Sequence, residues 1–147
     1  MQAIKHPKLR QLYDYWDGRR GGRQLPSRGD IDPVDMRFAI GDVILADVIE
    51  GDPPRFRIRL HGTNLSERTN FDLTGKMLDE MPAPEFRELV NRSFRKVART
   101  KEPMHVIADR LLDGRMQRYE AILLPLSSDG ERVDRLMVGM IFEPLRR

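Results

Sequence analysis

Residues 55–81 read R-F-R-I-R-L-H-G-T-N-L-S-E-R-T-N-F-D-L-T-G-K-M-L-D-E-M, and this stretch decides the fold that the sequence predicts. Apolar Phe56, Ile58 and Leu60 alternate with polar side chains at positions 55, 57, 59 and 61. Alternation with a period of two places one set on a buried sheet face and the other in solvent. We therefore expect a strand over 55–61 with His61 on its polar side. Gly62 ends this strand, and short helical pieces follow it.

The segments on both sides of this stretch predict four more strands and one long helix. A β-branched apolar run predicts a strand over 43–49, and the proline-containing turn at 51–54 joins it to the next strand. Strands are also expected over 104–112, 116–126 and 133–142. A helix is expected over 84–100, where apolar residues recur at helical spacing: Phe86, Leu89, Val90, Phe94 and Val97. This order predicts an α+β domain with one five-stranded antiparallel sheet and the long helix across one of its faces.

The stretch R-F-R-I-R-L-H-G-T followed by D-L-T-G-K resembles the second strand and first helices of a PAS domain, and is most similar to a bacterial subfamily of short single-domain PAS proteins. Other segments resemble the same subfamily: Tyr15-Trp16, Leu25-Pro26-Ser27-Arg28, Asp30-Ile31-Asp32-Pro33, and Leu124-Pro125-Leu126-Ser127 with Asp129-Gly130. Together they extend over nearly the whole chain. The resemblance implies a sensing or interaction module, and it leaves the ligand open because PAS domains share a scaffold and differ in what they bind.

An amphipathic helix is expected over residues 7–18, where Leu9, Leu12, Tyr13 and Trp16 fall on one helical face. We divide the chain into an N-terminal helical extension, 1–41, and a PAS-like core domain, 42–147. The apolar face can pack on the chain's own sheet or against a second copy. Large aromatic side chains are enriched at interface hot spots, and PAS domains, which the chain resembles, often pair through a preceding helix. We therefore expect a homodimer with these four residues in its interface.

Composition narrows the classes of function. The 147 residues include no cysteine, which excludes disulfides and thiolate metal sites. The sequence shows neither a signal-peptide pattern at its start nor a run of about 20 apolar residues, so a cytoplasmic protein without a membrane span is expected. The net charge of +3 is modest, and the basic residues form no stripe interleaved with aromatics, so nucleic-acid binding is not expected.

The sequence offers no arrangement typical of an enzyme, and no catalytic residue or metal site is expected. His105 and Asp109 lie four residues apart on a predicted strand, about 13 Å from each other and too far for a hydrogen bond. Some PAS domains hold haem through a histidine of the long helix or bond flavin to a cysteine. Residues 84–100 contain no histidine and the chain contains no cysteine, so neither cofactor is expected.

The remaining candidate site is the space between the long helix and the sheet. Its expected lining is Phe56, Ile58, Leu60, Met77, Phe86, Val90, Phe94, Ile107 and Tyr119, with Arg57 and His105 as polar contacts. An inward arginine needs a partner, which an acidic ligand would supply. The sequence thus predicts a non-catalytic sensor or signalling module that binds a small apolar or acidic metabolite or an unknown protein partner. The alternative is a dimerisation and interaction module whose core is fully packed.

Overall fold

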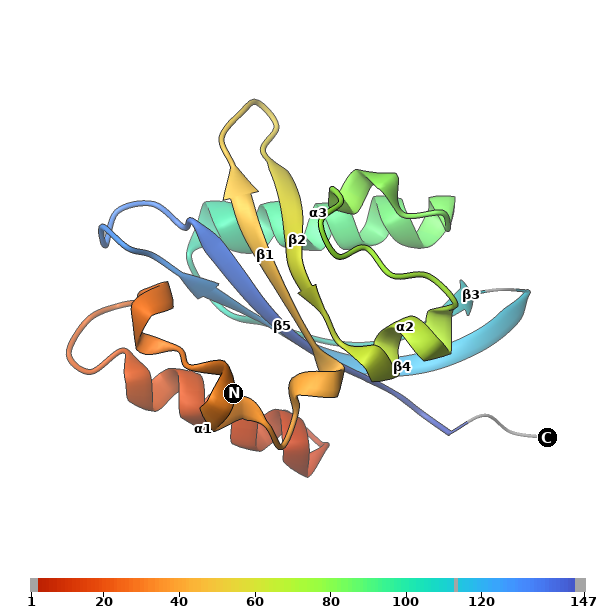
Figure 1. The fold of residues 1–147 in the computed structure, drawn as a ribbon, viewed down its shortest axis with the longest axis horizontal. Coiled ribbons are helices and arrows are strands. Elements are labelled where there is room, and N and C mark those ends of the chain that lie inside the picture. Colours follow the sequence, from red (N-terminus) through yellow and green to blue (C-terminus); the bar gives the residue numbers. More distant parts are fainter. Residues whose placement is uncertain (1–2, 113, 145–147) are drawn as a thin grey trace.

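Five strands form one antiparallel sheet in the order β2-β1-β5-β4-β3 (Figure 1). The strands are β1 (Val43–Ile49), β2 (Arg55–His61), β3 (Met104–Leu112), β4 (Arg115–Leu126) and β5 (Arg135–Phe142). The computed structural model describes residues 3–112 and 114–144. The α+β class and the five-stranded antiparallel sheet predicted from the sequence are confirmed.

Three α-helices and four single 3-10 turns accompany the sheet. The helices are α1 (Pro7–Arg19), α2 (Thr63–Thr69) and α3 (Pro84–Thr100), and the turns are η1 (Arg28–Asp30), η2 (Pro33–Met36), η3 (Ile40–Asp42) and η4 (Leu78–Glu80). Helix α3 covers the range predicted from its apolar stripe, and Phe86, Val90, Phe94 and Val97 of that stripe are buried. Proline at the first position of both α1 and α3 suits a helix start, where its missing N–H has no intrahelical partner.

Helices α1 and α3 cover opposite faces of the sheet. On β5, Val138 and Met140 lie against α3, whereas Gly139 between them lies under α1. Successive residues of a strand point to opposite faces, so the two helices sandwich the sheet. In Figure 1, α3 passes behind β1 and β2, and α1 lies at the lower left, on the other side of β5. We call the face under α3 the inner face and the face under α1 the outer face.

Helix α1 packs closely on its own chain. Leu9, Leu12 and Trp16 are at most 1% exposed, and the Trp16 indole N–H donates to the carbonyl of Pro125 at 2.9 Å. A Cβ at Gly139 would stand 2.7 Å from a methyl of Leu12, so only glycine admits the helix this close.

This packing corrects the role expected for the apolar face of α1. Three of the four residues predicted for a dimer interface, Leu9, Leu12 and Trp16, belong to the chain's own core, and the fourth, Tyr13, is half-buried with its ring 5.7 Å from that of Trp16. Pairing of two chains stays a prediction, and so does the division at residue 42.

A β-bulge in β2 changes which side chains face inward. Leu45 pairs with Leu60 and Ala46 pairs with Ile58, so Arg59 is an extra residue opposite β1. Beyond the bulge the alternation is shifted by one position. The prediction that Leu60 faces inward and His61 outward is therefore wrong: His61 is buried on the inner face, and half-buried Leu60 lies opposite Leu45 on the outer face.

The bulged Arg59 joins an ion cluster on the outer face. The carboxylate of Asp47 accepts hydrogen bonds from Arg59 and, at 2.9 Å, from Arg135 of β5. Burial alone would raise the pKa of Asp47, but the two guanidinium groups outweigh it and hold that pKa below its ordinary value. The cluster links β2, β1 and β5 across the outer face.

Candidate functional site

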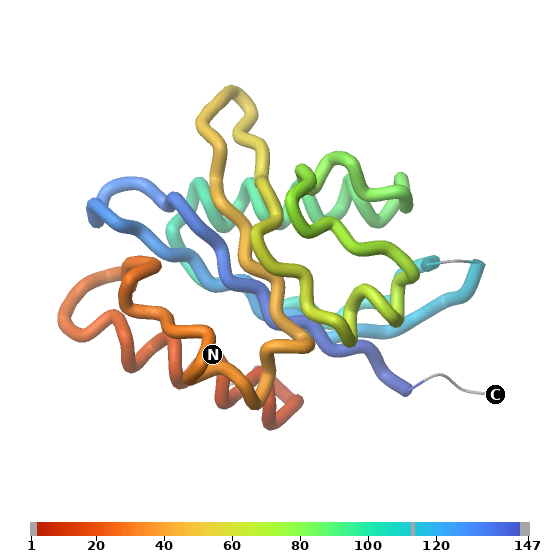
Figure 2. The backbone as a smooth tube through the Cα atoms, viewed as in Figure 1, coloured from red at the N-terminus to blue at the C-terminus, as the bar shows by residue number. Residues whose placement is uncertain are grey.

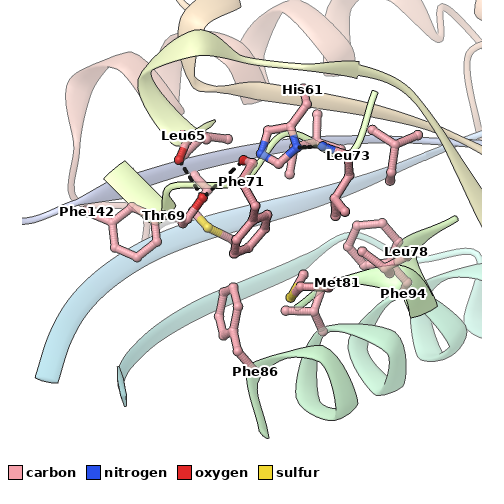
Figure 3. Close-up of a pocket in the computed structure, with 14 residues that line it drawn as sticks. His61, Leu65, Thr69, Phe71, Leu73, Leu78, Met81, Phe86, Phe94 and Phe142 are labelled. Carbon is pink, nitrogen blue, oxygen red and sulfur yellow. Dashed lines mark hydrogen bonds between the residues drawn. The ribbon is translucent and has the colours of Figure 1, made fainter. Parts of the chain in front are cut away.

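The candidate site is a small apolar pocket between α3 and the inner face, which we call the inner pocket (Figure 3). Its volume is about 20 Å³. Figure 3 shows His61, Thr69 and Phe71 on one side, with Met81, Phe86 and Phe94 facing them from the other. Ile44, Met140 and Phe142 of the sheet and Leu65 of α2 also contribute to the wall. A space of this size holds a single water molecule.

A second hollow of about 20 Å³ adjoins the inner pocket along α3. It is lined by residues that include Tyr119, Leu89, Val106 and Ala121. Val90, Phe94 and Met140 border both spaces. These three side chains therefore divide the interior between helix and sheet into two small compartments.

Several residues predicted from the sequence lie at these two spaces. Ile58, Phe86, Val90 and Phe94 line the inner pocket, and Tyr119 lines the second hollow. Phe56 lies behind Phe94, with the two rings edge-to-face at 5.3 Å. Burial raises the pKa of the Tyr119 hydroxyl, which keeps this group neutral at ordinary pH.

The other predicted residues lie away from the pocket. Leu60 and Ile107 are on the outer face, where Ile107 is 43% exposed, and Met77 lies beyond the edge of β2, bridged to Arg57. The two expected polar contacts are also absent from it. Arg57 is exposed, and the Nε2 atom of His105 bonds the Glu120 carboxylate at 2.6 Å outside the pocket. The placement therefore does not support an acidic ligand held by Arg57.

His61 is the polar group that the structure places at the inner pocket instead. Its Nδ1 atom accepts the backbone N–H of Leu73 at 3.0 Å. A neutral imidazole then carries its proton on Nε2, which makes no hydrogen bond with the residues that the structure describes. The Thr69 hydroxyl, the other polar group of the wall, donates at 2.9 Å to Leu65 of its own helix.

His61 should make stability depend on pH. Burial lowers its pKa below the ordinary 6.5, and the Asp72 carboxylate opposes this shift only in part. Between the two values the unfolded chain binds a proton that the folded chain does not, so the free energy of unfolding should fall as the pH drops below about 6.5. His61→Gln keeps an acceptor for Leu73 and should flatten this dependence. Urea unfolding of both proteins between about pH 7 and pH 5 measures it.

Comparison with the variant removes every contribution to the pH dependence that the two proteins share. Equal pH dependence in the two proteins would show that His61 titrates in the folded chain as it does in the unfolded chain.

Sequence reasoning missed the part of the wall formed by α2 and the loop after it. Leu65, Thr69, Phe71 and Leu73 come from short segments that have no sustained periodicity. One usable signal was Asn70, which ends α2 in the left-handed conformation at φ 69°, a conformation that asparagine adopts more readily than most residues.

Open grooves lie outside the interior. One, of about 670 Å³, lies between the β1–β2 turn, the C-terminal end of α3 and residues 129–134. Another, of about 520 Å³, lies on the outer face between residues 5–7, Ile107 and Ile141. Within residues 3–112 and 114–144, no cluster of histidine and carboxylate side chains fits a metal ion. None of the helices described combines the length and the hydropathy that crossing a membrane takes.

Known proteins of this architecture are PAS domains. The PAS domain of BvgS from Bordetella pertussis is similar at 17% identity, with a TM-score of 0.56, over 93% of this chain and 89% of that one. A sensory box sensor histidine kinase from Vibrio cholerae is similar at 15% identity and a TM-score of 0.51, over 70% and 83%. A variant of the fungal photoreceptor VVD is similar at 15% identity and a TM-score of 0.52, over 96% and 99%. These likenesses establish the fold.

A search of curated proteins found no match to this chain. The family model described as "PAS domain" matches residues 4–142, which include α1 as well as every strand of the sheet. This match confirms the resemblance seen in the sequence, and the chain belongs to the PAS domain family.

Proposed function

We propose that this chain is a non-catalytic signalling module that acts by contact with other protein chains and whose interior is filled by its own side chains. The PAS family, to which it belongs, is one of sensor and signalling modules. The observation that carries the proposal is the size of the interior. Two compartments of about 20 Å³ each have room for single waters and for no metabolite.

A filled core gives such a module a defined shape. The wall that divides the interior is made of Val90, Phe94 and Met140, and Phe94 is 1% exposed. Closely packed interiors change between discrete arrangements and do not deform continuously, which suits a domain that relays a state by contact.

One observation favours a second function, the sensing of a small apolar molecule with one hydrogen-bond acceptor. The Nε2–H group of His61 has no partner among the described residues, and it belongs to a wall that is otherwise almost wholly apolar. Methionine is unbranched and adapts its shape to a neighbour, so a shift of Met140 would join the two compartments.

Ile58→Trp separates the two functions. Ile58 is fully buried at the inner pocket. In a filled core the larger side chain should lower the free energy of unfolding by roughly 1–3 kcal/mol, the usual cost of overpacking. Urea unfolding measures this, and native mass spectrometry of the wild-type protein should show the mass of the chain alone.

A small molecule retained by the wild-type protein and lost from Ile58→Trp would overturn the filled core in favour of sensing. An absorbance spectrum of the same sample tests the cofactors, and we expect neither a Soret band nor flavin absorbance. Homodimerisation and a cytoplasmic location stay predictions. Because its own sheet covers the apolar face of α1, a second copy must use another surface.

A further inference from the structure

The two edges of the sheet differ in what covers them. On the free side of β2, Ile58 exchanges backbone hydrogen bonds with residues 75 and 76, at 2.8 and 2.9 Å, and Arg57 is bridged to Met77. β3, at the other edge, spans nine residues. In the described part of the chain its only backbone-to-backbone hydrogen bonds are those of its ladder with β4. A strand left open in this way is a template for pairing with another strand.

The same edge carries an uncovered apolar surface. Of the five large apolar side chains that are most exposed among the described residues, three lie on the outer face of the β3–β4 hairpin. These are Ile107, Leu111 and Met116, which are 43, 52 and 68% exposed. Leu111 and Met116 are directly opposite each other.

Helix α1 borders this surface at Pro7, across a groove that Ile107 also lines, and leaves the surface uncovered. Its start is fixed to Glu120, whose carboxylate accepts the backbone N–H groups of Lys5 and His6 at 2.7 and 2.8 Å. Figure 2 shows the β3–β4 hairpin, in blue-green, extending away from the helix. An exposed apolar patch beside an open strand edge indicates a protein contact.

We propose that β3 pairs antiparallel with β3 of a second copy about a two-fold axis at Ile107, giving one continuous ten-stranded sheet. A two-fold axis perpendicular to the sheet keeps the two outer faces side by side. Ile107 then lies opposite Ile107 of the partner, and Val106 lies opposite the partner's Ala108. This surface is that of the homodimer predicted from the sequence, and the proposal rests on that dimer.

The pattern of apolar and charged side chains favours this register over the next two along the strand. Pairing about Ile107 sets this apolar side chain against its own copy and sets His105, which bonds Glu120, opposite the partner's Asp109. Asp109 is paired with Arg118 at 2.8 Å within its own chain. Pairing about Ala108 would set apolar Ile107 opposite charged Asp109. Pairing about Asp109 would set two carboxylates opposite each other, which destabilises a sheet. Of these three registers, the one about Ile107 avoids both mismatches.

The absence of cysteine from the chain permits a direct test by single-cysteine cross-linking. Ile107→Cys should form a disulfide-linked dimer under mild oxidation, because directly opposite residues have Cα atoms about 4.5–5.5 Å apart, within disulfide reach. Leu111→Cys is the control on the same strand. In this register its two copies are about 26 Å apart along the strands. Val34→Cys, at a site 58% exposed and outside the sheet, measures random collision.

We expect Ile107→Cys to cross-link at least about tenfold faster than both controls, because it alone places its two Cα atoms within the distance that a disulfide spans. Equal rates for the three variants would overturn the surface. Light scattering tests pairing itself. Ile107→Asp should weaken the dimer at least about tenfold, whereas Val34→Asp should not. A wild-type protein that is monomeric at high concentration would contradict both the predicted dimer and the proposed β3 interface. A wild-type dimer that Ile107→Asp leaves unchanged would contradict the β3 interface alone.

Discussion

Trp16→Ala is expected to lower the free energy of unfolding by about 3–5 kcal/mol, the range for removing a large buried aromatic side chain. The indole is 1% exposed and donates to the Pro125 carbonyl at 2.9 Å. Loss of the indole leaves a cavity under α1 and leaves the Pro125 carbonyl without this hydrogen-bond donor. Domains of this size are stable by about 5–15 kcal/mol, so the variant should lose a large share of its stability. Urea unfolding of both proteins measures the difference.

Two control variants separate the loss of the buried ring from the loss of its hydrogen bond. Trp16→Phe keeps an aromatic ring under α1 and removes the hydrogen bond, so it should lose less. Tyr13→Ala removes a half-buried ring from the same helix and should also lose less. The mass in solution should be the same for all variants that stay folded. A fall in the mass of Trp16→Ala with an unchanged free energy of unfolding would instead indicate that the apolar face of α1 forms a dimer interface.

Phe94→Ala has the second large expected effect, a loss of about 3–5 kcal/mol. Phe94 is 1% exposed and borders both compartments of the interior. Its removal should join them into one apolar cavity. Such a cavity stays dry and takes up small apolar molecules such as benzene. Benzene should therefore raise the midpoint of thermal unfolding of Phe94→Ala and leave that of the wild-type protein unchanged.

Phe94→Leu is the matched control, because leucine fills much of the space and should give a smaller loss and a smaller benzene effect. A loss below about 1 kcal/mol in Phe94→Ala, without benzene binding, would mean that α3 collapses onto the sheet and closes the cavity. A wild-type protein that responds to benzene would show that its interior already opens to ligands, which contradicts the filled core.

The regular elements could be predicted closely from the sequence because their patterns are long. Three strands and α3 match the expected ranges, β4 begins at Arg115, one residue early, and β5 begins at Arg135, two residues late. The covering of α1 could not be predicted in the same way. Its spacing identifies an apolar face, but the close approach that lets its own sheet cover that face depends on Gly139, more than a hundred residues away.

The site was less predictable than the fold, because its polar group depends on the pairing of two strands. The segment R-F-R-I-R-L-H contains no signal that Arg59 forms a β-bulge and has no partner residue in β1. The expectation for Ile107 failed for a similar reason. Alternation along β3 is broken by apolar residues on both faces, and the surface it leaves uncovered is visible only once the sheet is assembled.

The bulge at Arg59 has a consequence for reading related chains. Loss of Arg59 would remove the bulge and leave His61 facing inward and Leu60 outward, because both residues already pair in register with β1. Regular pairing of the same seven residues, with Arg59 in the ladder, would instead turn Leu60 inward and His61 into solvent. Two homologues with an identical segment, one bulged at Arg59 and one regularly paired, would therefore present opposite side chains to anything that enters. The pairing of β2 with β1 is a better guide to the interior than the identity of the residues themselves.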